Sequence, residues 1–181
     1  MGSTPKILLD NEKLQLIIDR LCYQLIEDHK DFSNVAIVGI QPRGSLFAKR
    51  IITRLKELDA SLSPKYALLD PTFYRDDFRT KEEPIIPSST EFDFLIDGME
   101  IVLVDDVFYT GRTVRAALDA LVDFGRPKKV DLMTLINRRF SRELPIQPDF
   151  VGDTVDAVAS EVVKVEWDVD GKDQVLLYTE G

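Results

Sequence analysis

Three stretches of the chain carry apolar residues at the three- and four-residue spacing of an amphipathic helix. The first covers about residues 11–29, and Asp10 stands directly before it as the expected N-cap. The second contains the apolar positions from Ala48 to Leu58, and the third those from Val114 to Leu121. Gly125 is expected to end the third helix. These patterns predict three helices, each with one face buried against a core.

Short, mostly apolar runs separate and follow these helical patterns. They cover residues 35–40, 65–70, 101–104 and 130–136. Continuous apolar runs of this length are typical of strands that are buried on both faces of a sheet. The alternation of strand and helix therefore predicts an α/β fold, in which helices flank a central parallel sheet.

Two segments depart from this alternation. Residues 71–98 are rich in charge and proline, show no helical period and are too long for an ordinary connection, so we expect a functional flap there. An irregular stretch at 141–149 precedes two further strand patterns, at 162–169 and 174–178. Asp170-Gly171 between them predicts a tight turn, and hence a hairpin.

Length and composition set bounds on architecture and function. A chain of 181 residues with 44% hydrophobic residues is expected to form a single domain over residues 1–181, with a flap and a small C-terminal subdomain at about 137–181. The net charge of −9 argues against a surface that is basic all over, as a general nucleic-acid-binding protein would need. No apolar run approaches 18 residues and no signal peptide is recognisable, so the expected location is cytoplasmic, without membrane contact.

Cysteine and histidine each occur once in the chain. Cys22 lies on the apolar face of the first predicted helix, so we expect a buried structural thiol rather than a zinc ligand. His29 closes the same helix, where a cation interacts favourably with the helix dipole. Zinc hydrolysis and catalysis by a Ser-His or Cys-His pair are therefore not expected.

The most informative segment is residues 101–113, Ile-Val-Leu-Val-Asp-Asp-Val-Phe-Tyr-Thr-Gly-Arg-Thr. Ligands of open α/β sheets collect beyond the carboxyl ends of strands, and here a predicted strand ends in Asp105 and Asp106. The loop that follows offers hydroxyl groups, a glycine and the free N–H groups of a helix start, which suit a phosphate monoester. Because carboxylates repel phosphate, the two aspartates must face another part of the same ligand, such as hydroxyl groups or a metal ion.

This segment resembles the phosphoribosyl-pyrophosphate (PRPP) signature of the type I phosphoribosyltransferases. With Tyr109 and Gly111-Arg112, it is most similar to the PyrR family. Members of that family are uracil phosphoribosyltransferases that, in many bacteria, also regulate the pyrimidine operon by binding its mRNA. Further matches to the family occur in the same order along most of the chain, at Val38–Gly44, Tyr74–Asp77, Ala117–Pro127, Arg142–Ile146 and Asp149–Gly152.

The resemblance implies the type I phosphoribosyltransferase fold, with a flexible-loop hairpin and a C-terminal hood. It also implies transfer of the phosphoribosyl group from PRPP to uracil, which gives UMP and pyrophosphate. The implied roles are ribose binding by Asp105 and Asp106, 5′-phosphate binding by Tyr109, Thr110, Gly111, Arg112 and Thr113, and pyrophosphate binding by Gln41, Pro42, Arg43 and Gly44. Arg75 and Asp76 of the flap would close over the site, and the base would lie near Asn137 and Arg138.

Mg²⁺ is the implied cofactor, chelated mainly by PRPP itself rather than by direct protein ligands. Together with Arg43, it would stabilise the negative charge that grows on the departing pyrophosphate. Pyrophosphate loops of this family often hold a strained cis peptide, and proline lowers the cost of a cis bond from about 3 to about 1 kcal/mol. We therefore expect the Gln41–Pro42 bond to be cis.

The chain departs from the family pattern in two places. Relatives usually read Asp-Arg-Gly-His before Arg-Glu-Leu-Pro, where this chain reads Asn-Arg-Arg-Phe-Ser at 137–141. The first helix with its flanks, residues 10–31, holds three basic and six acidic residues, whereas RNA affinity depends on neutralising phosphates. RNA is therefore a weakly supported partner, unless a basic patch forms from Lys128, Lys129, Arg138, Arg139 and Arg142. A homo-oligomer is expected, because relatives form dimers and higher assemblies.

Several other readings compete with a uracil phosphoribosyltransferase. Gly39 to Gly44 has the glycine spacing of a P-loop, but Ser45 and Leu46 stand where an ATPase needs Lys and Ser or Thr. Receiver domains place their acidic pair near the first strand rather than after residue 100. Purine-salvage relatives usually carry Asp at the position of Tyr109, which favours a pyrimidine here. An RNA-binding attenuator with secondary catalysis, or an enzyme for another base, remains the alternative.

Overall fold

The structure, a computed structural model, describes residues 5–76, 89–169 and 172–179. Part of the expected flap, residues 77–88, and the expected turn at 170–171 lie outside the described residues. The elements in chain order are β1 (Lys6–Leu9), α1 (Asn11–His29), β2 (Val35–Ile40), α2 (Arg43–Leu58), β3 (Lys65–Leu69), the 3₁₀ turn η1 (Thr72–Tyr74), β4 (Glu100–Phe108), α3 (Arg112–Leu121), the 3₁₀ turn η2 (Val122–Phe124), β5 (Lys129–Arg138), β6 (Phe150–Val155), β7 (Glu161–Val169) and β8 (Lys172–Thr179).

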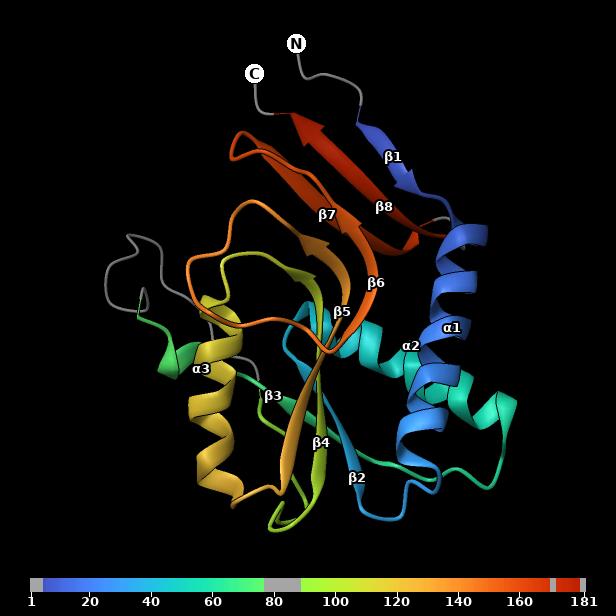
Figure 1. Cartoon of the computed structure of the whole chain (residues 1–181), viewed down its shortest axis with the longest axis vertical. Coiled ribbons are helices and arrows are strands. Elements are labelled where there is room, and N and C mark those ends of the chain that lie inside the picture. Colours follow the sequence, from blue (N-terminus) through green and yellow to red (C-terminus); the bar gives the residue numbers. More distant parts are fainter. Residues whose placement is uncertain (1–4, 77–88, 170–171, 180–181) are drawn as a thin grey trace.

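A five-stranded sheet with the order β3-β2-β4-β5-β6 forms the centre of the molecule. All of its neighbouring strands are parallel, which confirms the predicted α/β class. Helices α1 and α2 cover one face of the sheet and α3 covers the other (Figure 1). The apolar core is accordingly divided in two. One half contains Leu14 and Phe47 beneath α1 and α2, and the other contains Leu103 and Val114 beneath α3.

The three predicted helices are present. Asp10 caps α1 as expected, because its side chain accepts a hydrogen bond from the backbone N–H of Lys13 at 2.9 Å. Cys22 is buried on the inner face of this helix. Helix α3 is followed by η2 and by Gly125, which adopts a positive φ of 128°. None of the described helices is long and apolar enough to cross a membrane.

Strand β4 is longer than its apolar run predicts. Its pairing with β5 continues to the pair Phe108↔Asn137, so Asp105 and Asp106 lie inside the strand rather than after its end. Strands β1 and β6 were not predicted at all. β1 pairs with β8, which is distant in sequence, and β6 adds to the edge of the sheet beside β5. A local hydrophobic pattern does not reveal either kind of pairing.

A second sheet, with the antiparallel order β1-β8-β7, lies at one end of the molecule and is called the hood below (Figure 1). Its β7–β8 pair is the predicted hairpin, with the register Glu161↔Thr179. The hood is fixed to α2 by an aromatic contact, because the rings of Trp167 and Phe47 stack with centroids 5.9 Å apart. Arg50 of α2 lies over the same Trp167 ring at 4.5 Å.

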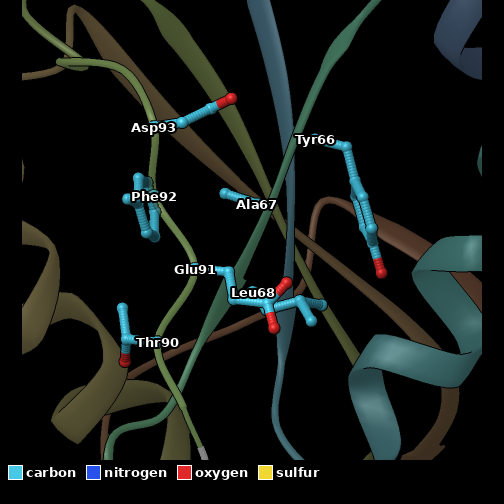
Figure 2. A pocket seen from close by; sticks show the side chains of 7 residues that line it. All are labelled: Tyr66, Ala67, Leu68, Thr90, Glu91, Phe92 and Asp93. Carbon is cyan, nitrogen blue, oxygen red and sulfur yellow. The ribbon is translucent and has the colours of Figure 1, made fainter.

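The outer edge of β3 is partly covered by the chain that follows the flap. Leu68 and Glu91 form an antiparallel bridge, with N–H···O distances of 3.1 and 2.9 Å in the two directions. Figure 2 shows residues 90–93 running beside β3, with a pocket of about 360 Å³ between the two segments. This bridge anchors the C-terminal end of the flap region to the edge of the sheet, because it satisfies backbone groups that an edge strand leaves open.

Candidate active site at the carboxyl edge of the parallel sheet

Two buried carboxylates lie near the carboxyl end of β4, the central strand. Asp105 and Asp106 are only 9% and 4% exposed. Each accepts a hydrogen bond from the next backbone N–H, at 2.9 Å from Asp106 and at 2.8 Å from Val107. Oδ2 of Asp106 is buried and finds no hydrogen-bond partner among the described residues. A buried oxygen with this unused capacity is suited to a ligand that donates hydrogen bonds or carries positive charge.

Burial dominates the electrostatics of this pair. Desolvation raises the pKa of Asp105 well above its usual range, and the nearby charge of Asp106 raises it further. Desolvation also raises the pKa of Asp106. The positive charge of Arg43 opposes the shift at both carboxylates, and that of Arg75 opposes it at Asp105, so both charges lie near the pair. The sheet edge thus combines two carboxyl groups that are costly to ionise with two cations from separate segments of the chain.

The loop after β4 forms the first anion cradle. Gly111 has a positive φ of 95° and directly precedes α3, so the free N–H groups of the first helical turn are turned toward the sheet edge. A cavity of about 250 Å³ opens beside this loop. It is lined by Arg75, Asp105, Val107, Phe108, Tyr109, Thr110, Gly111, Arg112, Thr113 and Val114. All five residues predicted for the 5′-phosphate are therefore grouped around one cavity, together with Asp105.

The loop after β2 forms a second helix start beside the same carboxylates. The Gln41–Pro42 bond is cis, which confirms the prediction, and α2 begins at Arg43. Gly44 packs directly on β4, because a Cβ at this position would lie 2.4 Å from the carbonyl oxygen of Val104. The starts of α2 and α3 thus flank the aspartate pair, and each offers backbone N–H groups to an anion.

The described start of the flap contacts the first cradle. Nη1 of Arg75 donates a hydrogen bond to Oγ1 of Thr113 at 3.2 Å. The carboxylate of Asp76 pairs with Arg112 at 2.5 Å and with Arg115 at 3.5 Å. Arg75 and Asp76 therefore lie against the 5′-phosphate loop, as far as the described residues extend.

The two residues predicted for the base pocket have different surroundings, because neighbouring strand positions point to opposite faces of a sheet. Arg138 is 5% exposed, lies 4.1 Å above the ring of Tyr109 and donates a hydrogen bond to the carbonyl of Val158 at 3.0 Å. Its Nε is buried without a partner among the described residues. Asn137 instead accepts a hydrogen bond from Arg142 at 2.6 Å.

The five basic residues considered as an RNA-binding patch do not form a single surface. Lys128 and Lys129 lie at the start of β5 and Arg138 at its end, roughly 30 Å away at about 3.3 Å per residue. Both lysines are also paired, with Glu100 at 2.7 Å and with Asp131 at 3.0 Å. The lysines and Arg138 are close in sequence but not in space, because the two ends of a ten-residue strand lie at opposite edges of the sheet.

Two contacts at the candidate site could not be predicted from the sequence. One is the stacking of Arg138, at the end of β5, on Tyr109 of the loop after β4, because it joins two segments distant in sequence. The other is the contact of Arg142 and Glu143 with the loop predicted to bind the 5′-phosphate; the two residues were noted in a family match, and Arg142 also in the basic patch. The family match was the available signal for Arg142 and Glu143. A match in an irregular segment indicates a functional role more often than a packing role.

Comparison with known proteins supports this description of the site. A family model described as a phosphoribosyl transferase domain matches residues 5–170. "Bifunctional protein PyrR" of Acetivibrio thermocellus is 45% identical over 171 residues, which cover 94% of this chain and 92% of that protein. The protein of the same name from Haemophilus ducreyi is 42% identical over 173 residues, which cover 95% and 96% of the two chains.

Solved structures agree at the level of the fold. The hypoxanthine phosphoribosyltransferase of Trypanosoma cruzi superimposes with a TM-score of 0.72 at 16% identity, and 97% of each chain is covered. A hypoxanthine phosphoribosyltransferase from Staphylococcus aureus gives a TM-score of 0.66 at 19% identity, with coverage of 83% and 77%. The sheet, the two helix starts and the relatives over nearly the full length lead to one assignment: the chain belongs to the PyrR family of phosphoribosyltransferases.

Proposed function

We propose that this phosphoribosyltransferase transfers the phosphoribosyl group of PRPP to uracil, with UMP and pyrophosphate as products. One observation carries the proposal: the N-termini of α2 and α3 flank the buried pair Asp105 and Asp106 at a single sheet edge. PRPP has one anionic group at each end of a ribose that carries two free hydroxyl groups. Two anion cradles with carboxylates between them match that order of groups.

Each part of PRPP has a proposed position. The 5′-phosphate lies against Tyr109–Thr113, where Arg75 and backbone N–H groups supply positive charge. The carboxylates of Asp105 and Asp106 accept hydrogen bonds from the ribose hydroxyls, which makes use of the unpartnered Oδ2 of Asp106. The pyrophosphate lies at the start of α2, within reach of Arg43.

The chemistry that follows is a substitution at the anomeric carbon without a covalent enzyme intermediate. The bond from that carbon to the pyrophosphate oxygen breaks, and a nitrogen of the base forms the new bond. Negative charge grows on the pyrophosphate as the bond breaks, and Arg43 with the α2 N–H groups is placed to stabilise that charge. Arg75 and Asp76, at the described start of the flap, are proposed to help exclude water that would hydrolyse PRPP.

The residues present are compatible with Mg²⁺ bound through the substrate. Among the described residues, no three His, Cys, Asp or Glu side chains are grouped so that they could hold a metal ion by themselves. Asp105 and Asp106 provide hard oxygen atoms on one side, which suits a cation whose other ligands are PRPP and water. When bound, Mg²⁺ supplies positive charge to the pyrophosphate.

The base is proposed to lie between Tyr109 and the hood. Arg138 closes this space with its guanidinium group over the Tyr109 ring, and its buried Nε is available as a hydrogen-bond donor. A donor at this position suits the carbonyl groups of uracil. Oδ1 of Asn137 is already engaged by Arg142, so the proposed contribution of Asn137 is weaker.

The test is UMP formation from uracil, PRPP and Mg²⁺, with the other common bases as a panel. Asp105→Asn and Asp106→Asn are expected to lower kcat/KM for PRPP by at least tenfold. Asp131→Asn is a matched control, because Asp131 is a buried carboxylate of the same sheet that lies at its opposite edge. A chain that forms no nucleotide from any base would refute the proposal, and product from a different base alone would refute its choice of uracil.

RNA binding is the second candidate function, favoured by the word "bifunctional" in the names of the relatives. We infer that a leader RNA of a pyrimidine operon would bind through a surface other than the basic patch that the structure divides. Filter binding at several salt concentrations tests this, with a sequence-scrambled RNA as the control. Equal affinity for both RNAs would count against regulation. Light scattering at the same protein concentration tests the expected homo-oligomer.

A further inference from the structure

The irregular segment between β5 and β6 lies against the outer side of the 5′-phosphate loop. Backbone N–H groups of Glu143 and Leu144 both donate hydrogen bonds to the carbonyl of Thr110, at 3.1 and 3.3 Å. Nη1 of Arg142 donates a hydrogen bond to the carbonyl of Tyr109. A carboxylate oxygen of Glu143 accepts one from Nε of Arg112 at 2.5 Å. Three consecutive residues therefore bind three of the loop's residues.

Arg142 is held more firmly than an ordinary surface arginine. Its guanidinium group lies over the Phe108 ring at 3.5 Å and also donates a hydrogen bond to Oδ1 of Asn137 at 2.6 Å. Burial lowers the pKa of Arg142 below its usual value, but an arginine remains charged at every physiological pH. The group is thus a fixed cation with its donors aimed at defined acceptors.

The direction of these bonds determines where the loop's own donors point. In a trans peptide, the carbonyl of one residue and the N–H of the next point in opposite directions. The carbonyls of Tyr109 and Thr110 face Arg142–Leu144, so the N–H groups of Thr110 and Gly111 face away from that segment. Leu144 also packs close to Gly111, at 3.4 Å from the position of a Cβ. Both N–H groups are therefore available on the side opposite to the segment.

We propose that Arg142, Glu143 and Leu144 form a clamp that holds the Tyr109–Arg112 loop with its N–H groups directed at the 5′-phosphate of PRPP. Arg142 and Glu143 are positioning residues in this proposal: they act on the phosphate through the loop and do not touch it. The proposal rests on the assignment of PRPP as substrate. It adds that the affinity for the 5′-phosphate end depends on a segment about 30 residues further along the chain.

Two probes separate the clamp from a general effect on the site. Ribose 5-phosphate tests the 5′-phosphate loop together with the ribose site, and pyrophosphate tests the start of α2, which the clamp does not contact. Isothermal titration of each probe into the full chain needs no knowledge of the base. An Arg142→Gln variant is expected to bind ribose 5-phosphate at least tenfold more weakly and pyrophosphate within twofold of the wild type. Arg142→Lys, which keeps the charge, should recover only part of the loss.

Arg139→Gln is the matched control, because Arg139 is a nearby exposed arginine that pairs with Asp156 rather than with the loop. It should leave both affinities within twofold. Glu143→Gln removes only the bond to Arg112 at an exposed position, so a two- to fivefold loss for ribose 5-phosphate is expected. This variant provides the measurement if Arg142→Gln does not fold.

The outcomes are distinct. An unchanged affinity for ribose 5-phosphate in Arg142→Gln, or in Glu143→Gln if the former does not fold, would overturn the clamp. Equal losses for both probes would also overturn it, because they would indicate a general structural role. If the wild type forms no nucleotide but the clamp variants still lose ribose 5-phosphate affinity selectively, the clamp stands and the proposed reaction fails.

Discussion

Gly44 packs the proposed pyrophosphate loop against the central strand, and a single methyl group there gives a sharp test of the site. A Cβ at residue 44 would lie 2.4 Å from the carbonyl oxygen of Val104 and 3.0 Å from Cα of Asp105. Both atoms belong to the backbone of a strand that is paired on both sides, so they cannot move aside. To restore van der Waals contact, the start of α2 must retreat by about 1 Å.

The cost follows from this geometry. Overpacking of a fitted interior costs about 1–3 kcal/mol, which corresponds to a fall in Tm of roughly 2–12 °C for a chain of this size. The displacement also moves Arg43 and the N–H groups of α2 away from the carboxylates. A misplacement of about 1 Å can lower activity on the order of a hundredfold. Gly44→Ala is therefore expected to lose both stability and kcat/KM for PRPP.

Gly152 provides the matched control. A Cβ at this position would lie 2.4 Å from the carbonyl of Leu135 and 2.9 Å from Ile17, so it meets an equal clash between β6 and its neighbours, outside the two anion cradles. Gly152→Ala should lower Tm similarly and leave kcat/KM within about threefold, measured well below the Tm of each variant. If Gly44→Ala keeps kcat/KM within twofold of the wild type, or if both variants lose it equally, the reasoning is refuted.

Three further predictions concern titratable groups. Burial and the charge of Asp106 raise the pKa of Asp105, so its ionised form destabilises the folded protein at neutral pH. Asp105→Asn should therefore raise Tm by roughly 2–6 °C at pH 7.5. The gain should vanish toward pH 4, where the carboxyl group is protonated in the folded protein. A Tm that is unchanged or lower at pH 7.5 would contradict this. Lys128 and then His29 lower the pKa of Glu100, so Glu100→Gln should cost about 0.5 kcal/mol at pH 7 in urea denaturation. The cost should shrink as the pH falls through the lowered pKa, and a pH-independent loss would contradict this. Burial raises the pKa of Cys22 to about 12, so the native thiol should resist a disulfide reagent at pH 8 and react fully after unfolding; rapid labelling of the folded chain would contradict that.

The order of the central elements could be predicted from the sequence because most of them carry strong local patterns. The residues of α1, β2 and the buried part of β4 form amphipathic or continuous apolar runs that need no knowledge of their partners. β1 has only four residues, and β6 carries the exposed residues Asp153 and Thr154, so both depend on pairing across long sequence distances. Local sequence patterns therefore do not predict these two strands, because tertiary contacts determine them.

The same division holds for the candidate site. The aspartate pair and the loop after it were predictable, since a single segment carries the strand, the carboxylates and the helix start. The contacts of Arg142 with Tyr109, and of Arg138 with the same residue, join segments about 30 residues apart. No spacing rule connects those positions. Asn137 and Arg138 were expected to act together, although the two-residue period of a strand already indicates that neighbours face opposite ways.

The pairing of β1 with β8 has a consequence for biosynthesis. Lys6 lies opposite Leu177, so the hood combines strands from near both ends of the sequence. A ribosome completes the five-stranded sheet, with both anion cradles and the aspartate pair, before it adds the residues of β8. A nascent chain without β8 therefore already holds every residue of the core beneath α3, whereas the core beneath α1 and α2 still lacks Val175 of β8. The hood is therefore the last part of the fold that can form.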